Sequence, residues 1–143
     1  FYMEYILLLT ACINPDGMPF TCLADVGVRK KQYIEALNFY LKNTTRKIVF
    51  VENSGTDNSS SFKDFQHRIE FLCFDGNLCF DKRKGKGYGE ALILEYAMAK
   101  SEFITDDVLI FIFSILFLLR FLPVLAGWFS RREGGLPRLI PSL

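Results

Sequence analysis

The sequence predicts an α/β protein whose sheet is mostly parallel, and three observations lead to this prediction. Apolar, β-prone runs recur at residues 5–12, 47–51 and 68–74. Segments with apolar residues at three- and four-residue spacing lie between or after these runs, as on one face of a helix. The resulting order of strand, helix, strand, helix, strand, helix implies parallel pairing with right-handed crossovers.

The first predicted strand, residues 5–12, ends at the turn-forming sequence NPDG of residues 14–17. Residues 9–12, LTAC, also resemble a bacterial lipoprotein cleavage box in which Cys12 would be acylated. A secretory signal, however, needs a basic start and roughly 7–15 apolar residues. The chain before Cys12 has no Lys or Arg, carries Glu4 and has only a short apolar core. We therefore expect a buried strand here.

A helix is predicted over residues 28–42, because its apolar residues recur at helical spacing: Tyr33, Ile34, Leu37, Tyr40 and Leu41. The second strand, residues 47–51, contains an uninterrupted apolar run, which is typical of a strand buried on both faces. The serines at residues 59–61 are expected to cap a short helix that carries Phe62 and Phe65.

The third strand is predicted over residues 68–74, and DGN at residues 75–77 forms its turn. A basic, glycine-rich loop follows at residues 81–89. The apolar residues after this loop predict a further helix: Ala91, Leu92, Ile93, Tyr96 and Ala97.

The composition limits the function classes. The 143 residues are enough for one domain with a real core, and the net charge of +1 gives no reason to expect nucleic acid as a partner. The four cysteines have no CxxC spacing, and the single histidine adds little to a zinc site. We therefore expect reduced thiols in a cytosolic domain.

Polar residues follow the second strand directly: Glu52, Asn53, Ser54 and Asp57. In open α/β sheets, ligands bind in the crevice outside the carboxyl ends of the strands. This position predicts a ligand rim. From the residues alone, Glu52 has two interpretations that stay open, namely a ligand contact or a solvated strand end.

The basic loop also has two interpretations. A helix amino terminus preceded by glycines and lysines suits a diphosphate, because it offers backbone N–H groups and positive charge. The segment in question is Lys82, Arg83, Lys84, Gly85, Lys86 and Gly87. Its spacing matches neither GxxxxGK[ST] nor GxGxxG. The alternative is a solvated basic loop.

Three segments together carry a resemblance to a known family: ILLLTACINP at residues 6–15, VFVENSGTD at 49–57 and GKGYGEALILEYAMAKSEFI at 85–104. They resemble the nucleotide-binding half of bacterial glycosyltransferases of the GT-A fold that build lipopolysaccharide and capsule. The resemblance implies a Rossmann-like, three-layer α/β/α fold and a nucleotide-sugar donor. It assigns donor binding to Thr10, Asn14, Glu52, Asn53, Lys86 and Gly87.

The resemblance covers about residues 3–105, so residues 1–105 are expected to form a truncated, donor-binding half domain. Many family members carry an Asp-x-Asp metal motif after the last of these helices. Here Asp106 and Asp107 stand near that position but are adjacent. They are retained as candidate ligands for Mg²⁺ or Mn²⁺. The half that binds the glycan or lipid-linked acceptor has no counterpart, so catalysis is expected to be very low or absent.

Residues 106–129 form an apolar segment, predicted to be helical, and residues 130–143 an irregular tail. Residues 108–129 are long enough to span a bilayer, which takes about 20 apolar residues. The flanking charges, however, would place the domain outside the cytoplasm by the positive-inside rule, whereas sugar nucleotides are expected inside. Three alternatives stay open: an interfacial anchor, a buried helix, or non-native sequence from a disrupted reading frame.

The expected location is the cytoplasm, including the cytoplasmic face of the inner membrane if residues 108–129 act as an anchor. Two rival functions stay open. One is a non-catalytic, membrane-anchored α/β interaction protein. The other is a different nucleotide-binding transferase, which would also need Lys and Gly near phosphates.

Overall fold

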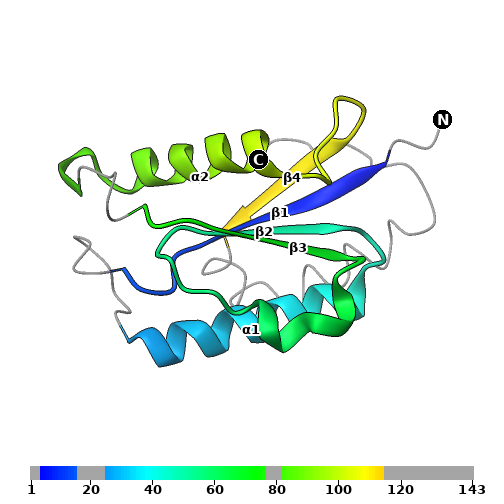
Figure 1. The fold of residues 1–143 in the computed structure, drawn as a ribbon, viewed down its shortest axis with the longest axis horizontal. Coiled ribbons are helices and arrows are strands. Elements are labelled where there is room, and N and C mark those ends of the chain that lie inside the picture. Colours follow the sequence, from blue (N-terminus) through cyan, green and yellow to red (C-terminus); the bar gives the residue numbers. More distant parts are fainter. Residues whose placement is uncertain (1–3, 16–24, 77–81, 115–143) are drawn as a thin grey trace, which may run out of the picture.

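A parallel four-stranded sheet forms the centre of the protein, in the strand order β3-β2-β1-β4. We describe residues 4–15, 25–76 and 82–114 of a computed structural model of the chain. The strands are β1 (Tyr5–Ala11), β2 (Ile48–Glu52), β3 (Ile69–Cys73) and β4 (Leu109–Ser114). All three strand pairs are parallel, as the sequence predicted for the first three strands (Figure 1).

The two central strands are the most apolar because both their faces are covered. All seven residues of β1 and all five of β2 are buried. Pairing joins Leu7 to Ile48 and Leu9 to Phe50, so the residues opposite each other point to the same face. The burial of β1 confirms the prediction of a strand at residues 5–12.

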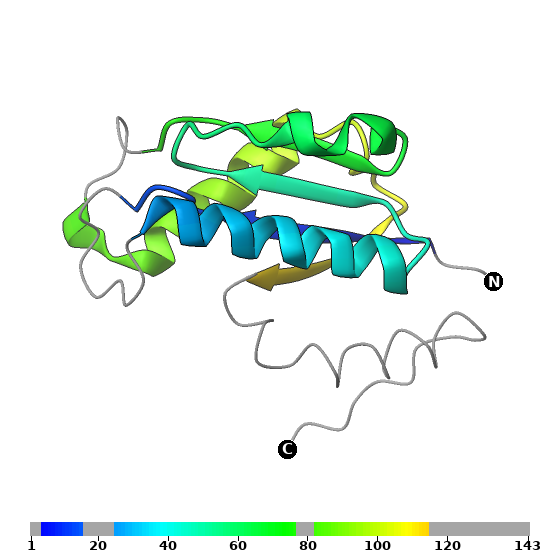
Figure 2. The same ribbon diagram turned by 90° about the horizontal axis from the view of Figure 1, so that it is seen from below.

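Helices cover both faces and give three layers. The long helix α1 (Val26–Asn43) and the 3-10 helix η1 (Ser59–Phe65) lie on one face, and α2 (Lys86–Lys100) lies on the other (Figures 1 and 2). A short 3-10 turn, η2 (Lys82–Lys84), precedes α2. Asn58, whose side chain makes no capping bond, precedes η1, so the predicted serine cap is not formed.

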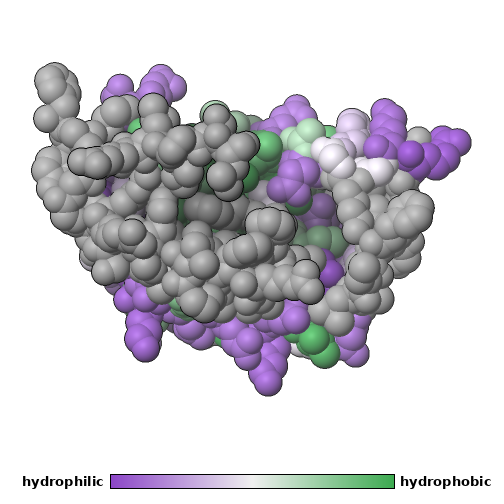
Figure 3. All heavy atoms as spheres, turned by 180° about the vertical axis from the view of Figure 1, so that it is seen from behind, coloured by the Kyte–Doolittle hydropathy of each residue, from purple (hydrophilic) through white to green (hydrophobic). Residues whose placement is uncertain are grey.

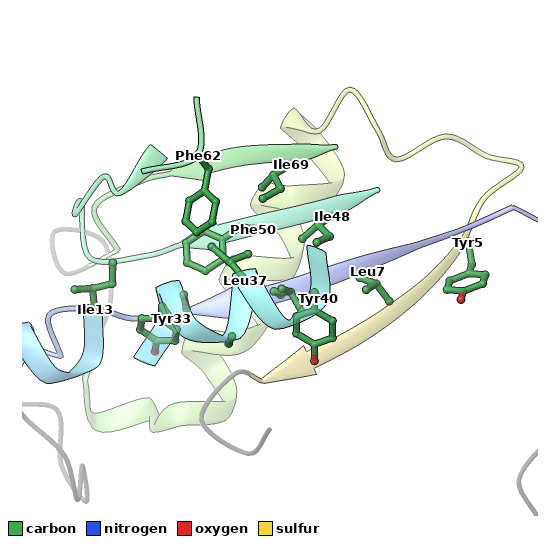
Figure 4. Packing of buried hydrophobic residues seen from close by; sticks show 13 residues of the cluster. Tyr5, Leu7, Ile13, Tyr33, Leu37, Tyr40, Ile48, Phe50, Phe62 and Ile69 are labelled. Carbon is green, nitrogen blue, oxygen red and sulfur yellow. The ribbon is translucent and has the colours of Figure 1, made fainter. Parts of the chain in front are cut away.

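The core has two parts, one on each side of the sheet. On the α1 side, Tyr33, Leu37 and Tyr40 pack against the alternate sheet residues Leu7, Leu9, Ile48 and Phe50 (Figure 4). On the α2 side, Ile93 and Ala97 pack against Ile6, Leu8, Val49 and Val51. In each layer, apolar residues spaced three or four positions apart on the helix therefore pack against every second residue of the strands.

The outer faces of the helices are polar. Lys31, Glu35, Asn38 and Lys42 follow one another along the exposed side of α1. Figure 3 shows hydrophilic side chains gathered along the upper and lower margins of the molecule, where α2 and α1 face the solvent. The layers thus end at polar surfaces on both sides.

One predicted element is corrected by the structure. Residues 109–114, expected to begin an apolar helical segment, form the strand β4 beside β1. An apolar run with no clear period fits a buried strand as well as a helix. Here the free edge of β1 provides the hydrogen-bonding partner. The rest of that segment and the tail, 115–143, lie outside the described residues.

Within the described residues, no helix combines the length and the apolar character needed to cross a bilayer.

Candidate functional site

The carboxyl edge of the sheet gathers most of the residues that the sequence singled out. The chain leaves β1, β2 and β3 at this edge, and both α1 and α2 begin there (Figure 1). This is the position at which parallel α/β sheets bind ligands.

Glu52 is a buried acid at the end of β2, with 1% of its surface exposed. Its Oε1 accepts hydrogen bonds from the backbone N–H of Ile13 at 2.9 Å and of Ser54 at 3.0 Å. Its Oε2 accepts from the N–H of Ser54 at 3.0 Å and of Thr56 at 2.9 Å, and from the Cys73 thiol at 3.5 Å. The Ser54 hydroxyl also donates to Oε1. The carboxylate therefore joins the ends of three of the four strands, β1, β2 and β3.

Further hydrogen bonds connect the loops around Glu52. The N–H of Asn14 donates to the Ser54 hydroxyl at 2.9 Å. The backbone of Asn53 bonds on both sides, because its N–H donates to Ala11 O at 3.1 Å and its oxygen accepts from Gly76 N–H at 2.8 Å. These contacts fix the loops that follow β1, β2 and β3 relative to one another.

The side chain of Asn53 differs from that of Glu52 in its hydrogen bonding. Its Oδ1 is buried and has no hydrogen-bond partner among the residues that the structure describes. A buried amide oxygen without a partner is costly, so it favours a donor that approaches from outside the chain. Asn53 therefore stays a candidate for ligand binding, whereas the hydrogen-bonding capacity of Glu52 is taken up by its own chain.

A buried arginine lies behind this rim. Arg29, with 3% of its surface exposed, stands in the first turns of α1, and its Nε donates to Cys12 O at 2.7 Å. The same guanidinium donates to the Tyr33 hydroxyl at 3.1 Å. Tyr33 in turn donates to Cys12 O and accepts from Cys12 N–H. Arg29 and Tyr33 thus fix the backbone just beyond β1.

The two nearby thiols are poor nucleophiles. Burial raises the pKa of Cys12 to about 11; the charge of Arg29 opposes this rise and that of Glu52 adds to it. Burial also raises the pKa of Cys73 to about 11, and the Glu52 charge contributes to that rise. Because the thiolate is the reactive form, both side chains are protonated near neutral pH and serve as packing and hydrogen-bonding groups.

The two helices that begin at this edge differ in their first turns. In α1, the carboxylate of Asp25 accepts from Val28 N–H at 2.8 Å, so the helix start is capped. In α2, the residue before the helix is Gly85, with φ of 81°, no side chain caps the start, and the first turn contains no acid. Among the described residues, nothing outside the helix's own backbone lies within 4 Å of a Cβ built at Gly87. Within the described part of the chain, the start of α2 therefore lacks the side-chain cap that α1 has.

Thr10 and Glu90 connect β1 to α2. The Thr10 hydroxyl, in a side chain that is 4% exposed, donates to Glu90 Oε1 at 2.7 Å. This bond sets the start of α2 over the end of β1. Nearby, the Lys84 ammonium lies 4.5 Å from the centre of the Tyr88 ring. The side chain of Lys86 lies outside the described structure.

Asp106 and Asp107 lie at the opposite edge. Both are exposed in the turn that precedes β4, at the amino ends of the strands. β4 has six residues, so about 20 Å of strand separates these acids from the carboxyl edge at about 3.3 Å per residue. No group of three or more metal-ligand side chains occurs in the described part of the chain. A cation held by these two acids would therefore not touch a diphosphate bound at the start of α2.

By backbone, the structure brings all six predicted donor-binding residues to one edge: Thr10, Asn14, Glu52, Asn53, Lys86 and Gly87. They divide between the faces, because Glu52 points to the α1 side and Thr10 to the α2 side. Sequence reasoning missed Arg29. Its spacing of four residues from Tyr33 and eight from Leu37 places it on the buried face of α1, and that signal was available.

No family model, curated protein or solved structure shows a significant match to this chain.

Proposed function

We propose that the carboxyl edge of this sheet binds the donor of a glycosyl transfer, a nucleotide sugar, with the diphosphate at the start of α2. The observation that carries this proposal is the contrast between the two helix starts at that edge. α1 is capped by Asp25, whereas no described side chain caps the first N–H groups of α2, and no described atom outside the helix backbone lies within 4 Å of a Cβ built at Gly87. A diphosphate requires such N–H groups and positive charge.

The nucleoside would lie over the ends of β1 and β2. The unused Oδ1 of Asn53 accepts a hydrogen bond from a base or a ribose hydroxyl, and Asn14 lies in the adjacent loop. In this proposal Glu52 does not contact the ligand. It holds in place the loops that carry Asn14 and Asn53. Thr10 acts in the same way through Glu90.

The reaction would be transfer of the sugar to a glycan or lipid-linked acceptor in the synthesis of a bacterial surface polysaccharide. The helix start and the lysines before it would stabilise the charge of the departing nucleoside diphosphate. The resemblance noted above extends to about residue 105 and does not include an acceptor half. We therefore propose donor binding with little or no turnover for this chain.

Isothermal titration calorimetry with a panel of UDP-, GDP- and CMP-sugars tests this proposal. Free nucleoside triphosphates and monophosphates serve as comparison ligands, because a nucleotidyltransferase would prefer a triphosphate. We expect one nucleoside diphosphate sugar to bind more tightly than the free nucleoside monophosphate and triphosphate with the same base. It fails if no nucleotide sugar binds, or if the triphosphate binds most tightly.

A further inference from the structure

The free edge of β3 carries an ordered row of unpaired backbone groups. Arg68 O accepts from Ile48 N–H at 2.8 Å, and Phe74 N–H donates to Glu52 O at 3.0 Å, so even-numbered residues of this segment face β2. Backbone groups of alternate residues point in opposite directions in a strand. The N–H and C=O groups of Ile69, Phe71 and Cys73 therefore point away from the sheet. Among the described residues, the one contact to these groups is from the Tyr96 hydroxyl to Cys73 O, at 3.5 Å.

A hollow of about 590 Å³ runs along this edge. η1 and the residues around it form one wall, β3 forms the floor, and Tyr96 from α2 stands on the other side. The lining is apolar along the strand and polar at the rim: Phe62, Ile69, Phe71, Leu72, Cys73 and Tyr96, then Asp57, Ser59, Ser60, Lys63 and Gln66. Such a shape can take side chains that point to either face of an added strand.

The edge lacks most of the features that protect edge strands from pairing. Natural edges are guarded by Pro, by Lys, by a bulge or by a covering segment. β3 reads IEFLC, without Pro, Lys or Arg, and its five residues pair with β2 in unbroken register. No described segment covers it, and the carboxylate of Glu70 is engaged by Ser101 and the backbone N–H of Glu102. Among the described residues, nothing prevents a further strand from pairing with β3 along this edge.

We propose that this edge receives an extended segment of a partner protein, which is added as a further strand beside β3. The outward N–H and C=O groups of Phe71, together with the N–H of Cys73, would pair with the backbone of that segment. Its alternate side chains would lie against Phe62 and Phe71 on one face and against Leu72 and Tyr96 on the other. The fitting segment is therefore short, uncharged at its centre and apolar at alternate positions.

Amide hydrogen exchange followed by NMR on the full chain tests this proposal. The amides of Phe71 and Cys73 report the outward edge, and those of Glu70 and Leu72, which face β2, are the internal control. The probe is the synthetic peptide acetyl-KVTVTVK-amide. The matched control is the same peptide with every central residue N-methylated, which removes its N–H donors. In the free protein, the outward amides are expected to exchange at least tenfold faster than the control amides.

Addition of the unmodified peptide is expected to slow the exchange of Phe71 and Cys73 at least tenfold and to leave Glu70 and Leu72 unchanged. The N-methylated peptide is expected to have no effect. Three results would overturn the proposal. Slow outward exchange in the free protein at every concentration means that the chain covers its own edge. Slowing that grows with protein concentration means that a second copy is the occupant. Outward exchange unaffected by the peptide means that the edge does not add a strand.

A variant separates occlusion of the hollow from loss of the fold. Ser60→Trp places a large side chain at the exposed rim of the hollow, while Lys31→Trp makes the same change on the solvent face of α1. Peptide protection of Phe71 is expected to be lost in the first variant and kept in the second. Equal protection in both would also count against the proposal.

Discussion

The backbone N–H of Ile13 donates to Glu52 Oε1 at 2.9 Å, although the two residues are 39 positions apart in the chain. This bond joins the loop after β1 to the end of β2, and the other bonds of the same carboxylate reach Ser54, Thr56 and Cys73. Glu52 therefore organises the carboxyl edge from inside. Its position in the sequence suggested either a ligand contact or a solvated strand end, and the structure shows a buried carboxylate whose two oxygens both accept hydrogen bonds from its own chain.

Glu52→Gln is expected to destabilise the protein strongly for a substitution of nearly equal size. The new NH₂ group would face backbone N–H donors in either orientation of the carboxamide. Each buried group left without a partner costs about 1–3 kcal/mol. We expect the free energy of unfolding from urea denaturation to fall by at least about 2 kcal/mol, because two or more donors lose their acceptor.

The matched variant is Glu90→Gln. Glu90 is half-buried and accepts from Thr10, and a glutamine oxygen can accept the same bond. A loss below about 1 kcal/mol is expected there, in the range of ordinary surface and half-buried changes. Equal losses in the two variants would show that Glu52 does not organise the edge.

Gly76→Ala is expected to disturb the same edge by close contact. A Cβ at this position would lie 2.9 Å from Asn53 O and 3.3 Å from the ring of Phe74. Overpacking of this kind costs typically about 1–3 kcal/mol. Gly87→Ala is the control, since nothing lies within 4 Å of its Cβ and the residue is in a helix. Urea denaturation should show a loss for the first variant and a gain of about 0.5–1 kcal/mol for the second.

The thiols of Cys12 and Cys73 should stay protonated to unusually high pH. Burial raises the pKa of both to about 11, so the folded state keeps protons that the unfolded state releases at lower pH. The contribution of these groups to stability is therefore present below about pH 9 and declines between about pH 9 and 11.

Alkylation with iodoacetamide measures this directly. Peptide mass spectrometry of the labelled protein gives the rate at each cysteine, and the rate follows the thiolate fraction. For Cys12 and Cys73 the rate should go on rising up to about pH 11. A plateau near pH 9, as for an exposed thiol, would refute the effect of burial.

Much of the fold could be predicted from the sequence because apolar residues recur at different spacings in its helices and its strands. The apolar run of β2 and the three- and four-residue spacing of Tyr33, Leu37 and Tyr40 give unambiguous signals, and the parallel order followed from their alternation. Residues 109–114 were placed wrongly because a continuous apolar run carries no period. The edge of β1 that decides their conformation is not visible in local sequence.

The candidate site could be predicted only in position. The sequence placed Glu52 and Asn53 at the end of a strand, which the structure confirms. It could not show that the Glu52 carboxylate is saturated by backbone N–H groups, because those donors come from Ile13 and Thr56 in loops that only the fold brings together. It also could not place Asp106 and Asp107 at the far edge without knowing that they precede a strand rather than follow one.

The substitution Gly87→Asp tests most directly the claim that α2 receives a diphosphate. A carboxylate in the first turn is favourable for the helix by about 0.3–1 kcal/mol. The same charge would repel a diphosphate at that position. Ala91→Asp, on the exposed side of the same helix, adds the same net charge one turn further along and is the control.

The measurement is calorimetric titration of the best-binding nucleotide sugar into the original protein and both variants. We expect Gly87→Asp to keep or raise the stability of the fold and to lower the affinity at least tenfold, or by about 1.4 kcal/mol. Ala91→Asp should leave the affinity within about threefold, or about 0.7 kcal/mol. Equal affinity in Gly87→Asp and the original protein, or no binding by the original protein, would contradict the account.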